Sequence, residues 1–165
     1  YKIYKIISEI KNTEYPDLNI TVTISKLQEG DKTFQDIKNI KTIKIDSQDT
    51  RIPGGYQQGF FERCSSIENI NIPTTITIIG GGAFNSCTKL KEINIPSSVE
   101  IIEGGSFENC ISLIEITIPS TVKYIHERAF NNCTKLERIK IDLYQTKIER
   151  NSFDIFTNRF IYSIF

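Results

Sequence analysis

The sequence lacks an excess of charge of either sign, and it lacks a long hydrophobic run. Its 20 basic and 20 acidic residues cancel. Such a balance provides no basic surface of the kind that nucleic-acid or anionic-membrane binding requires. No apolar run approaches the roughly 20 residues needed to span a bilayer. We therefore expect no nucleic-acid partner and no direct membrane insertion.

Several residue types are also scarce. The chain has no methionine, no tryptophan and a single histidine, His126. One histidine cannot build a multi-histidine metal site, and its place in a variable turn favours a solvated side chain over a catalytic base. The apolar residues are dominated by isoleucine and accompanied by many threonines, and such β-branched residues favour strands over helices. The expected fold class is therefore mainly β.

Four cysteines reveal an internal repeat. Cys64, Cys87, Cys110 and Cys133 each follow the previous one by 23 residues. Other apolar columns keep the same spacing: Phe61, Phe84, Phe107, Phe130 and Phe153; Ile67, Leu90, Leu113 and Leu136; Ile70, Ile93, Ile116 and Ile139; Ile72, Ile95, Ile118 and Ile141; and Ile79, Ile102, Ile125 and Ile148. A unit of this length cannot enclose its own core, so the coils must stack and bury shared ladders of identical side chains.

Each unit is expected to contain a short strand followed by a second extended segment. In the segment LKEINIP, Leu90, Ile93 and Ile95 alternate with polar residues, and the proline then ends the strand. Val99 and Ile102 pack inward in the second segment, after which paired glycines allow a tight turn. The pattern predicts a solenoid with a row of short parallel strands.

The repeat continues upstream of the regular units. Phe34, Ile37 and Ile40 keep the spacing of the phenylalanine, cysteine and leucine columns. Before Phe61 the spacing is four residues longer than in the other units. We expect this insertion to bulge as a loop over Pro53 to Gly59.

Both ends of the array are irregular. Residues 1–30 are expected to form an N-terminal cap, with an alternating strand from Leu18 to Ile24 and a helical stripe before it. In the last coil, Phe153, Tyr162 and Ile164 keep the register. This C-terminal edge is apolar and has no polar cap, so it is a candidate surface for homo-oligomer formation or for contact with further repeats.

One stretch of the sequence carries a family resemblance. The pattern IPSSVEIIEGGSFENCISLIEITIPSTVKYIHERAFNNCTKLERIKI resembles the BspA-like, or Treponema-type, class of leucine-rich repeats. The resemblance implies a right-handed leucine-rich repeat coil with the strand row on its concave face, and an array of about five to six coils over residues 31–165. Members of the class occur in bacterial surface proteins and protozoan parasites, where they are associated with adhesion and protein-protein contact. A cell-surface or secreted location follows as an expectation.

The residues that most often carry chemistry have structural explanations here. One cysteine per coil favours a buried ladder of reduced thiols over a metal site or a disulfide framework, which need close pairs. No helix with a Lys-Ser or Lys-Thr follows the run 80–82, so a turn is favoured over a phosphate site. Glu62, Glu108 and Glu127 are scattered over turns. We therefore expect no metal, no cofactor and no enzymatic activity from this chain.

Two glycosylation sequons are present. Asn19 lies in Asn-Ile-Thr and Asn132 in Asn-Cys-Thr. Asn132 is next to a buried column, so Asn19 is the better acceptor. Either would be used only on a eukaryotic secretory route.

The outward side of the strand row is the candidate binding face, because its side chains can vary without disturbing the core. Two columns occupy it: Thr42, Asn69, Glu92, Glu115 and Arg138; and Lys44, Asn71, Asn94, Thr117 and Lys140. The first column runs from neutral through acidic to basic and the second begins and ends with lysine, so a partner would meet an Asn-rich centre flanked by charge. The alternative is an ordinary solvated surface, since aromatic anchors are nearly absent.

Two hypotheses for function follow. The favoured one is an adhesion or recognition module that binds a protein or glycoprotein partner through the concave strand face and the Pro53 to Gly59 loop. The other is a structural or intracellular scaffold segment that self-assembles through its apolar end. The chain starts at Tyr1 without a start methionine or a signal-peptide layout, so we expect a processed or excised piece.

Overall fold

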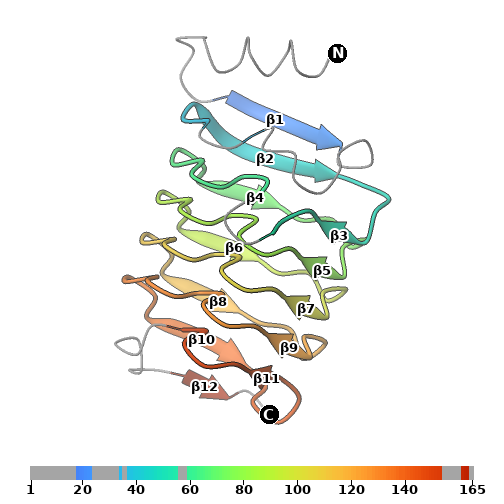
Figure 1. Cartoon of the computed structure of the whole chain (residues 1–165), viewed down its shortest axis with the longest axis vertical. Coiled ribbons are helices and arrows are strands. Elements are labelled where there is room, and N and C mark those ends of the chain that lie inside the picture. Colours follow the sequence, from blue (N-terminus) through green and yellow to red (C-terminus); the bar gives the residue numbers. More distant parts are fainter. Residues whose placement is uncertain (1–17, 24–33, 35–36, 56–58, 154–160, 164–165) are drawn as a thin grey trace.

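The computed structural model describes residues 18–23, 34, 37–55, 59–153 and 161–163. Within these ranges the chain forms stacked coils whose strands lie in two parallel rows, and it contains no helix (Figure 1). Every pairing between strands is parallel. The predicted β solenoid is confirmed.

The first row contains the strand that the sequence predicts in each unit. Its members are β1 (Leu18–Thr23), β2 (Ile40–Asp46), β4 (Asn69–Asn71), β6 (Glu92–Asn94), β8 (Glu115–Thr117), β10 (Arg138–Ile141) and β12 (Ile161–Ser163). The second row is formed by β3 (Arg51–Ile52), β5 (Ile78–Ile79), β7 (Ile101–Ile102), β9 (Tyr124–Ile125) and β11 (Lys147–Ile148). Each coil therefore has a strand on two of its sides, and its apolar side chains pack between them.

The strand pairing follows the sequence columns. Ile93 pairs with Ile116, which pairs with Ile139, so equivalent isoleucines lie directly above one another. In β4 and β6 the central isoleucine is buried and both of its neighbours are exposed. This alternation places one face of the first row on the core and the other in solvent.

The first row is not one continuous sheet. Its hydrogen-bonded strands form a three-stranded sheet, β1-β2-β4, and a four-stranded sheet, β6-β8-β10-β12, whereas the second row is continuous from β3 to β11. No ladder therefore joins β4 to β6, although the coils that contain them are joined through β5 and β7. A repeat of constant length does not reveal such a break.

The last coil departs from the predicted register by one residue. Ile161 pairs with Ile139 and Tyr162 pairs with Lys140, so the expectation that Tyr162 continues the isoleucine column is wrong. Phe153 keeps its predicted place, since it forms a parallel bridge with Phe130. The predicted position of Ile164 lies outside the described residues.

The N-terminal strand prediction is confirmed for Leu18–Thr23, which adds to the edge of β2. The helical stripe predicted before it lies outside the described residues. Part of the 1–30 cap is therefore a further member of the first strand row.

A ladder of phenylalanine rings fills the centre of the stack. Phe61, Phe84, Phe107 and Phe130 have no exposed surface. The ring centroids of successive members lie 5.2 to 5.4 Å apart with interplanar angles of at most 14°. Because each ring contacts the rings above and below it, the core continues from one coil to the next.

A second ladder is formed by the four cysteines, which are free and buried. Each thiol donates to the carbonyl oxygen of a phenylalanine in the preceding coil; for Cys110 and Cys133 the Sγ···O distances are 3.3 and 3.2 Å. Burial, reinforced by the neighbouring thiols, raises the pKa of Cys87 and Cys110 well above the ordinary value. The predicted structural role of the cysteines agrees with this geometry.

These thiols should be unreactive in the folded chain, because only an accessible thiolate attacks a disulfide reagent. We expect no reaction with a chromogenic disulfide reagent under native conditions and four reacting thiols in guanidinium. Ser120→Cys places a thiol at an exposed position and serves as the reactive control. Rapid reaction of the native wild-type chain would contradict the ladder.

Candidate partner-binding face and turn-side groove

The residues predicted to form the binding face lie together on the outward side of the first strand row. Seven of the ten are exposed, and Thr42, Glu115 and Lys140 are half-buried. The register aligns them in two groups: Thr42 with Asn69 and Lys44 with Asn71; and Glu92 with Glu115 and Arg138, beside Asn94 with Thr117 and Lys140. The two groups meet at the break between β4 and β6.

Strand β1 extends this face beyond the predicted columns. Asn19 pairs with Thr42, and Thr21 pairs with Lys44. Both Asn19 and Thr21 are exposed. They lie within the predicted N-terminal cap, in the segment where the alternation of Leu18 and Ile20 with polar residues predicts a strand.

Part of the predicted charge on the face is compensated within it. Arg138 Nε lies 2.8 Å from Glu115 Oε2, and Lys140 Nζ lies 3.0 Å from Glu115 Oε1. The hydrogen bond from Arg138 and then that from Lys140 lower the pKa of the Glu115 carboxyl below its ordinary value. A partner therefore meets a bridged acid-base cluster at this end of the row.

The Glu115 cluster gives a pH-dependent signature. A lowered carboxyl pKa means that the pairing contributes stability above the ordinary pKa and loses it as pH falls through the lowered value. We expect the Glu115 carboxyl resonance to titrate at lower pH than free glutamate, and Arg138→Ala to raise its pKa. Lys135→Ala, at an exposed position in the same coil, is the control that should leave it unchanged.

A second surface feature is a groove of about 900 Å³ on the turns that follow the second strand row. It spans several coils and is lined by Gly81 and Gly82, Gly104 and Gly105, and the segment 126–128, together with neighbouring polar residues. No aliphatic side chain lines it. We call this feature the turn-side groove.

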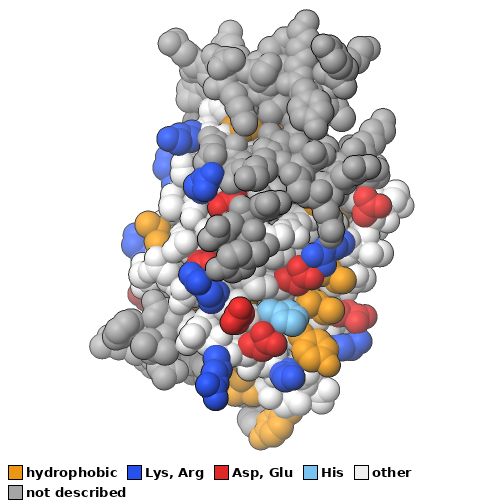
Figure 2. Space-filling model, in the orientation of Figure 1, with side chains coloured by type: hydrophobic (Ala, Val, Ile, Leu, Met, Phe, Trp, Pro, Cys, Tyr) orange, Lys and Arg blue, Asp and Glu red, His pale blue; other side chains and the backbone are white. Residues whose placement is uncertain are grey.

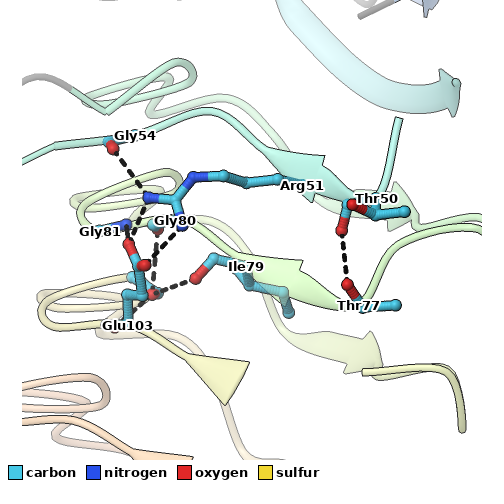
Figure 3. Close-up of polar contacts among 9 residues, drawn as sticks. Thr50, Arg51, Gly54, Thr77, Ile79, Gly80, Gly81 and Glu103 are labelled. Atoms are coloured by element: carbon cyan, nitrogen blue, oxygen red, sulfur yellow. Dashed lines mark hydrogen bonds and ion pairs between the residues drawn. The ribbon is translucent and has the colours of Figure 1, made fainter. Parts of the chain in front are cut away.

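Glu103, which lines the turn-side groove, forms a charge pair that crosses two coils. Arg51 donates to both carboxylate oxygens of Glu103 at 2.5 and 2.6 Å (Figure 3). Glu103 Oε2 also accepts the Gly81 N–H at 2.9 Å. Two coils and the intervening turn are thereby joined by one side chain, an arrangement typical of bidentate arginine recognition.

Deeper in the same region, Glu62 and Glu108 are buried. Glu108 accepts from Arg128 Nε at 2.9 Å and from Asn131 Nδ2 at 3.1 Å, and Glu62 lies 3.3 Å from Arg63 Nη1. The expectation that these glutamates are scattered over turns misses this arrangement. Their common column, one residue after the phenylalanine, was the signal that could have placed them together.

The other turn residues singled out from the sequence also lie here. His126 is half-buried and its Nδ1 is 3.3 Å from Glu149 Oε2, so it is more than a solvated turn residue. Gly82 and Gly105 have φ angles of +64° and +66°, which supports the predicted turn role. Arg128 occupies the next position of that column with φ +60°, a conformation that non-glycine residues rarely adopt.

Neither a metal site nor a membrane span is found among the residues that the structure describes. No group of three or more His, Cys, Asp or Glu side chains there could hold an ion. Those same residues include no helix of the length and apolarity that crossing a membrane demands.

The asparagines of both sequons are exposed. Asn19 lies in β1, and Asn132 donates from Nδ2 to Asn109 Oδ1 at 2.7 Å. Asn132 therefore belongs to an amide ladder between coils, whereas Asn19 lies on the strand face.

Stacked coils with a parallel strand row and inward ladders of Leu, Ile, Phe and Cys define a leucine-rich repeat protein. The model of the BspA type leucine rich repeat region matches residues 56–161 in 6 copies. The chain belongs to this family, as the resemblance implied. Repeats of this kind are typically non-enzymatic modules that mediate protein-protein interaction.

Three solved structures are similar to the chain. The T. pallidum leucine rich repeat protein has a TM-score of 0.64 at 25% identity over 74% of this chain and 59% of its own. A leucine-rich repeat protein from Bacteroides ovatus has 0.60 at 28% identity over 79% and 38% of the two chains. A leucine rich cell surface protein from Faecalibacterium prausnitzii has 0.62 at 25% identity over 86% and 35%. The chain thus spans less than two thirds of each. No curated protein matches it.

Proposed function

We propose that the chain is a non-catalytic binding module that recognises a protein or glycoprotein partner through its strand face. The observation that carries the proposal is the alternation in the first row, where buried isoleucines hold the strands in place and the exposed neighbours form two aligned polar columns. Such a surface is rigid in its backbone and free in its side chains. The ordered backbone favours recognition, because little backbone entropy is lost on binding. The exposed side chains can contact a partner without disturbing the core.

The extent of the strand face predicts weak binding by one copy. Its sheets of three and four strands, at a spacing of about 4.8 Å, span about 29 Å. If the strand row is about 15 Å wide in the direction of the strands, the face covers about 430 Å². A standard interface buries about 800 Å² per partner. Tight adhesion would therefore require additional contacts, such as the Pro53 to Gly59 loop, or several copies displayed together.

A surface location is part of the proposal. One similar structure is that of a leucine rich cell surface protein. An exposed position on a cell provides the multivalent display that a small face needs. Adhesion is then the role that best combines weak single contacts with a repeated surface.

Site-specific photo-cross-linking tests the strand face. A photoreactive amino acid replaces Thr117, which is exposed on β8, or Thr121, which is exposed on the turn before β9. Each labelled chain is mixed with cells of the source organism or with the surface to which those cells attach. We expect a partner to cross-link to position 117 and not to position 121. Equal yields from both positions would reject a face-specific interaction.

The second hypothesis, self-assembly through the C-terminal edge, stays a prediction. Strand β12 pairs with β10 in the described part of that edge, and most of the last coil lies outside it. Light scattering of the wild type and of Ile161→Lys, a substitution in the isoleucine column of the last coil, separates the two functions if the variant keeps the circular dichroism spectrum of the wild type. A dimer that becomes a monomer on substitution favours the scaffold, whereas two monomers favour the strand-face module.

A further inference from the structure

The turn-side groove lies on the turns and is separate from the strand face. In three successive coils the second residue after the second-row strand lines it; these residues are Gly81, Gly104 and Glu127. Figure 2 shows the chain's one histidine, in pale blue, with acidic side chains in red beside it. These three backbone positions repeat, and so they can be compared directly.

Two of the three backbone N–H groups are bonded to a carboxylate of the next coil. Glu103 Oε2 accepts from Gly81 N at 2.9 Å, and Glu149 Oε2 accepts from Glu127 N at 3.0 Å. The equivalent residue of the coil between them is His126. Within the ranges that the structure describes, the Gly104 N–H has no acceptor, because the place of the carboxylate is taken by an imidazole whose Nδ1 is directed to Glu149.

The surroundings of the Gly104 N–H restrict what can bind there. An anion is disfavoured by the carboxylates of Glu103, Glu127 and Glu149 that line the groove. An apolar group gains little, because no aliphatic side chain is available to it. A hydroxyl group is uncharged and polar, so it suits this site. Its oxygen can accept the Gly104 N–H while its proton is donated to a carboxylate.

Two of the carboxylates that line the groove are already paired with arginines. The buried Glu108 and the half-buried Glu103 are already engaged by Arg128 and Arg51. Their remaining lone pairs can accept hydrogen bonds, but their charge is largely compensated. The lining, with five glutamates and two arginines, therefore offers many hydrogen-bond acceptors and few donors.

We propose that the turn-side groove binds a neutral carbohydrate chain, with a hydroxyl oxygen accepting from the Gly104 N–H and a hydroxyl proton donated to Glu127. The groove volume of about 900 Å³ suits a short oligosaccharide. Successive coils repeat at about 4.8 Å, which is close to the advance per sugar in an extended β-linked chain. This site is independent of the strand face and would give the module a second, glycan-directed contact.

The test titrates the ¹⁵N-labelled full chain with cello-, xylo-, manno- and chito-hexaose. At least one sugar is expected to shift the amide resonances of Gly81, Gly104 and Glu127. His126→Glu supplies the missing carboxylate and should weaken this binding at least tenfold, and Glu127→Gln, at an exposed side chain, should weaken it in a chain that folds normally. Glu92→Gln on the strand face is the matched control, expected to bind as the wild type does.

Three outcomes would overturn the site. The first is the absence of a shift at Gly104 with all four sugars. The second is unchanged sugar binding by both His126→Glu and Glu127→Gln. The third is binding of hexalysine alone, abolished by salt, which would assign the groove to a basic peptide instead.

Discussion

Phe107→Ala is expected to destabilise the chain by about 3–5 kcal/mol, the usual cost of truncating a buried phenylalanine to alanine. The Phe107 ring has no exposed surface, and the rings of Phe84 and Phe130 lie 5.4 and 5.2 Å from it. Its loss opens a cavity between two coils that are themselves held by stacking. Because each coil is stabilised by its neighbours, the whole array should unfold at lower denaturant.

Urea unfolding followed by circular dichroism measures this effect. Tyr144→Ala, which removes an aromatic ring that is 80% exposed, is the control and should change the free energy of unfolding by less than about 0.5 kcal/mol. Similar small effects for both variants would mean that the phenylalanine ladder does not hold the coils together.

Gly80→Ala is expected to cost about 3 kcal/mol through overpacking. A Cβ at this position would lie 2.3 Å from the Ile52 carbonyl oxygen and 2.7 Å from the Gly54 nitrogen. Both are backbone atoms of the preceding coil, which can yield only if the coils separate. The same column carries side chains at Glu103 and His126, so the restriction arises where the insertion brings Pro53 and Gly54 close.

The matched control is Gly55→Ala, because a Cβ there has no atom within 4 Å. Differential scanning calorimetry of the two variants should show a large drop in melting temperature for Gly80→Ala and nearly none for Gly55→Ala. If the two melt together, the insertion does not pack against the next coil as described.

The sequence predicted the core of this solenoid well, because a constant repeat makes each buried column visible. Ile93, Ile116 and Ile139 share one spacing, and the structure stacks them in one ladder. The same reasoning placed the cysteines correctly as buried thiols. In a solenoid, equivalent positions of successive coils have the same packing environment, so a column of similar residues in the sequence identifies a buried ladder.

Two features of the strand row were beyond that reasoning. The pairing of Ile161 with Ile139 shortens the last step by one residue, which a fixed repeat length cannot express. The break between β4 and β6 leaves the side-chain columns intact, since it affects backbone hydrogen bonds alone. Side-chain spacing in the sequence therefore does not reveal where the backbone pairing is interrupted.

The turn-side groove was missed for a different reason. Three residues that line it, Glu103, His126 and Glu149, occupy one column with Gly80, so the position varies between coils. Variation made them look like solvated turn residues. In the structure the variation is itself informative: a carboxylate accepts from Gly81 N and from Glu127 N, whereas His126 replaces it beside Gly104, whose N–H has no acceptor among the described residues.

The central claim is that recognition takes place on the strand face. It is tested most directly by measuring the affinity of the cross-linked partner, once purified, for two variants with an added arginine at exposed positions, Thr117→Arg and Thr121→Arg. We expect Thr117→Arg to weaken binding at least tenfold, equivalent to about 1.4 kcal/mol, and Thr121→Arg to leave it unchanged. Unaltered affinity of Thr117→Arg, or an equal loss in both variants, would contradict the claim.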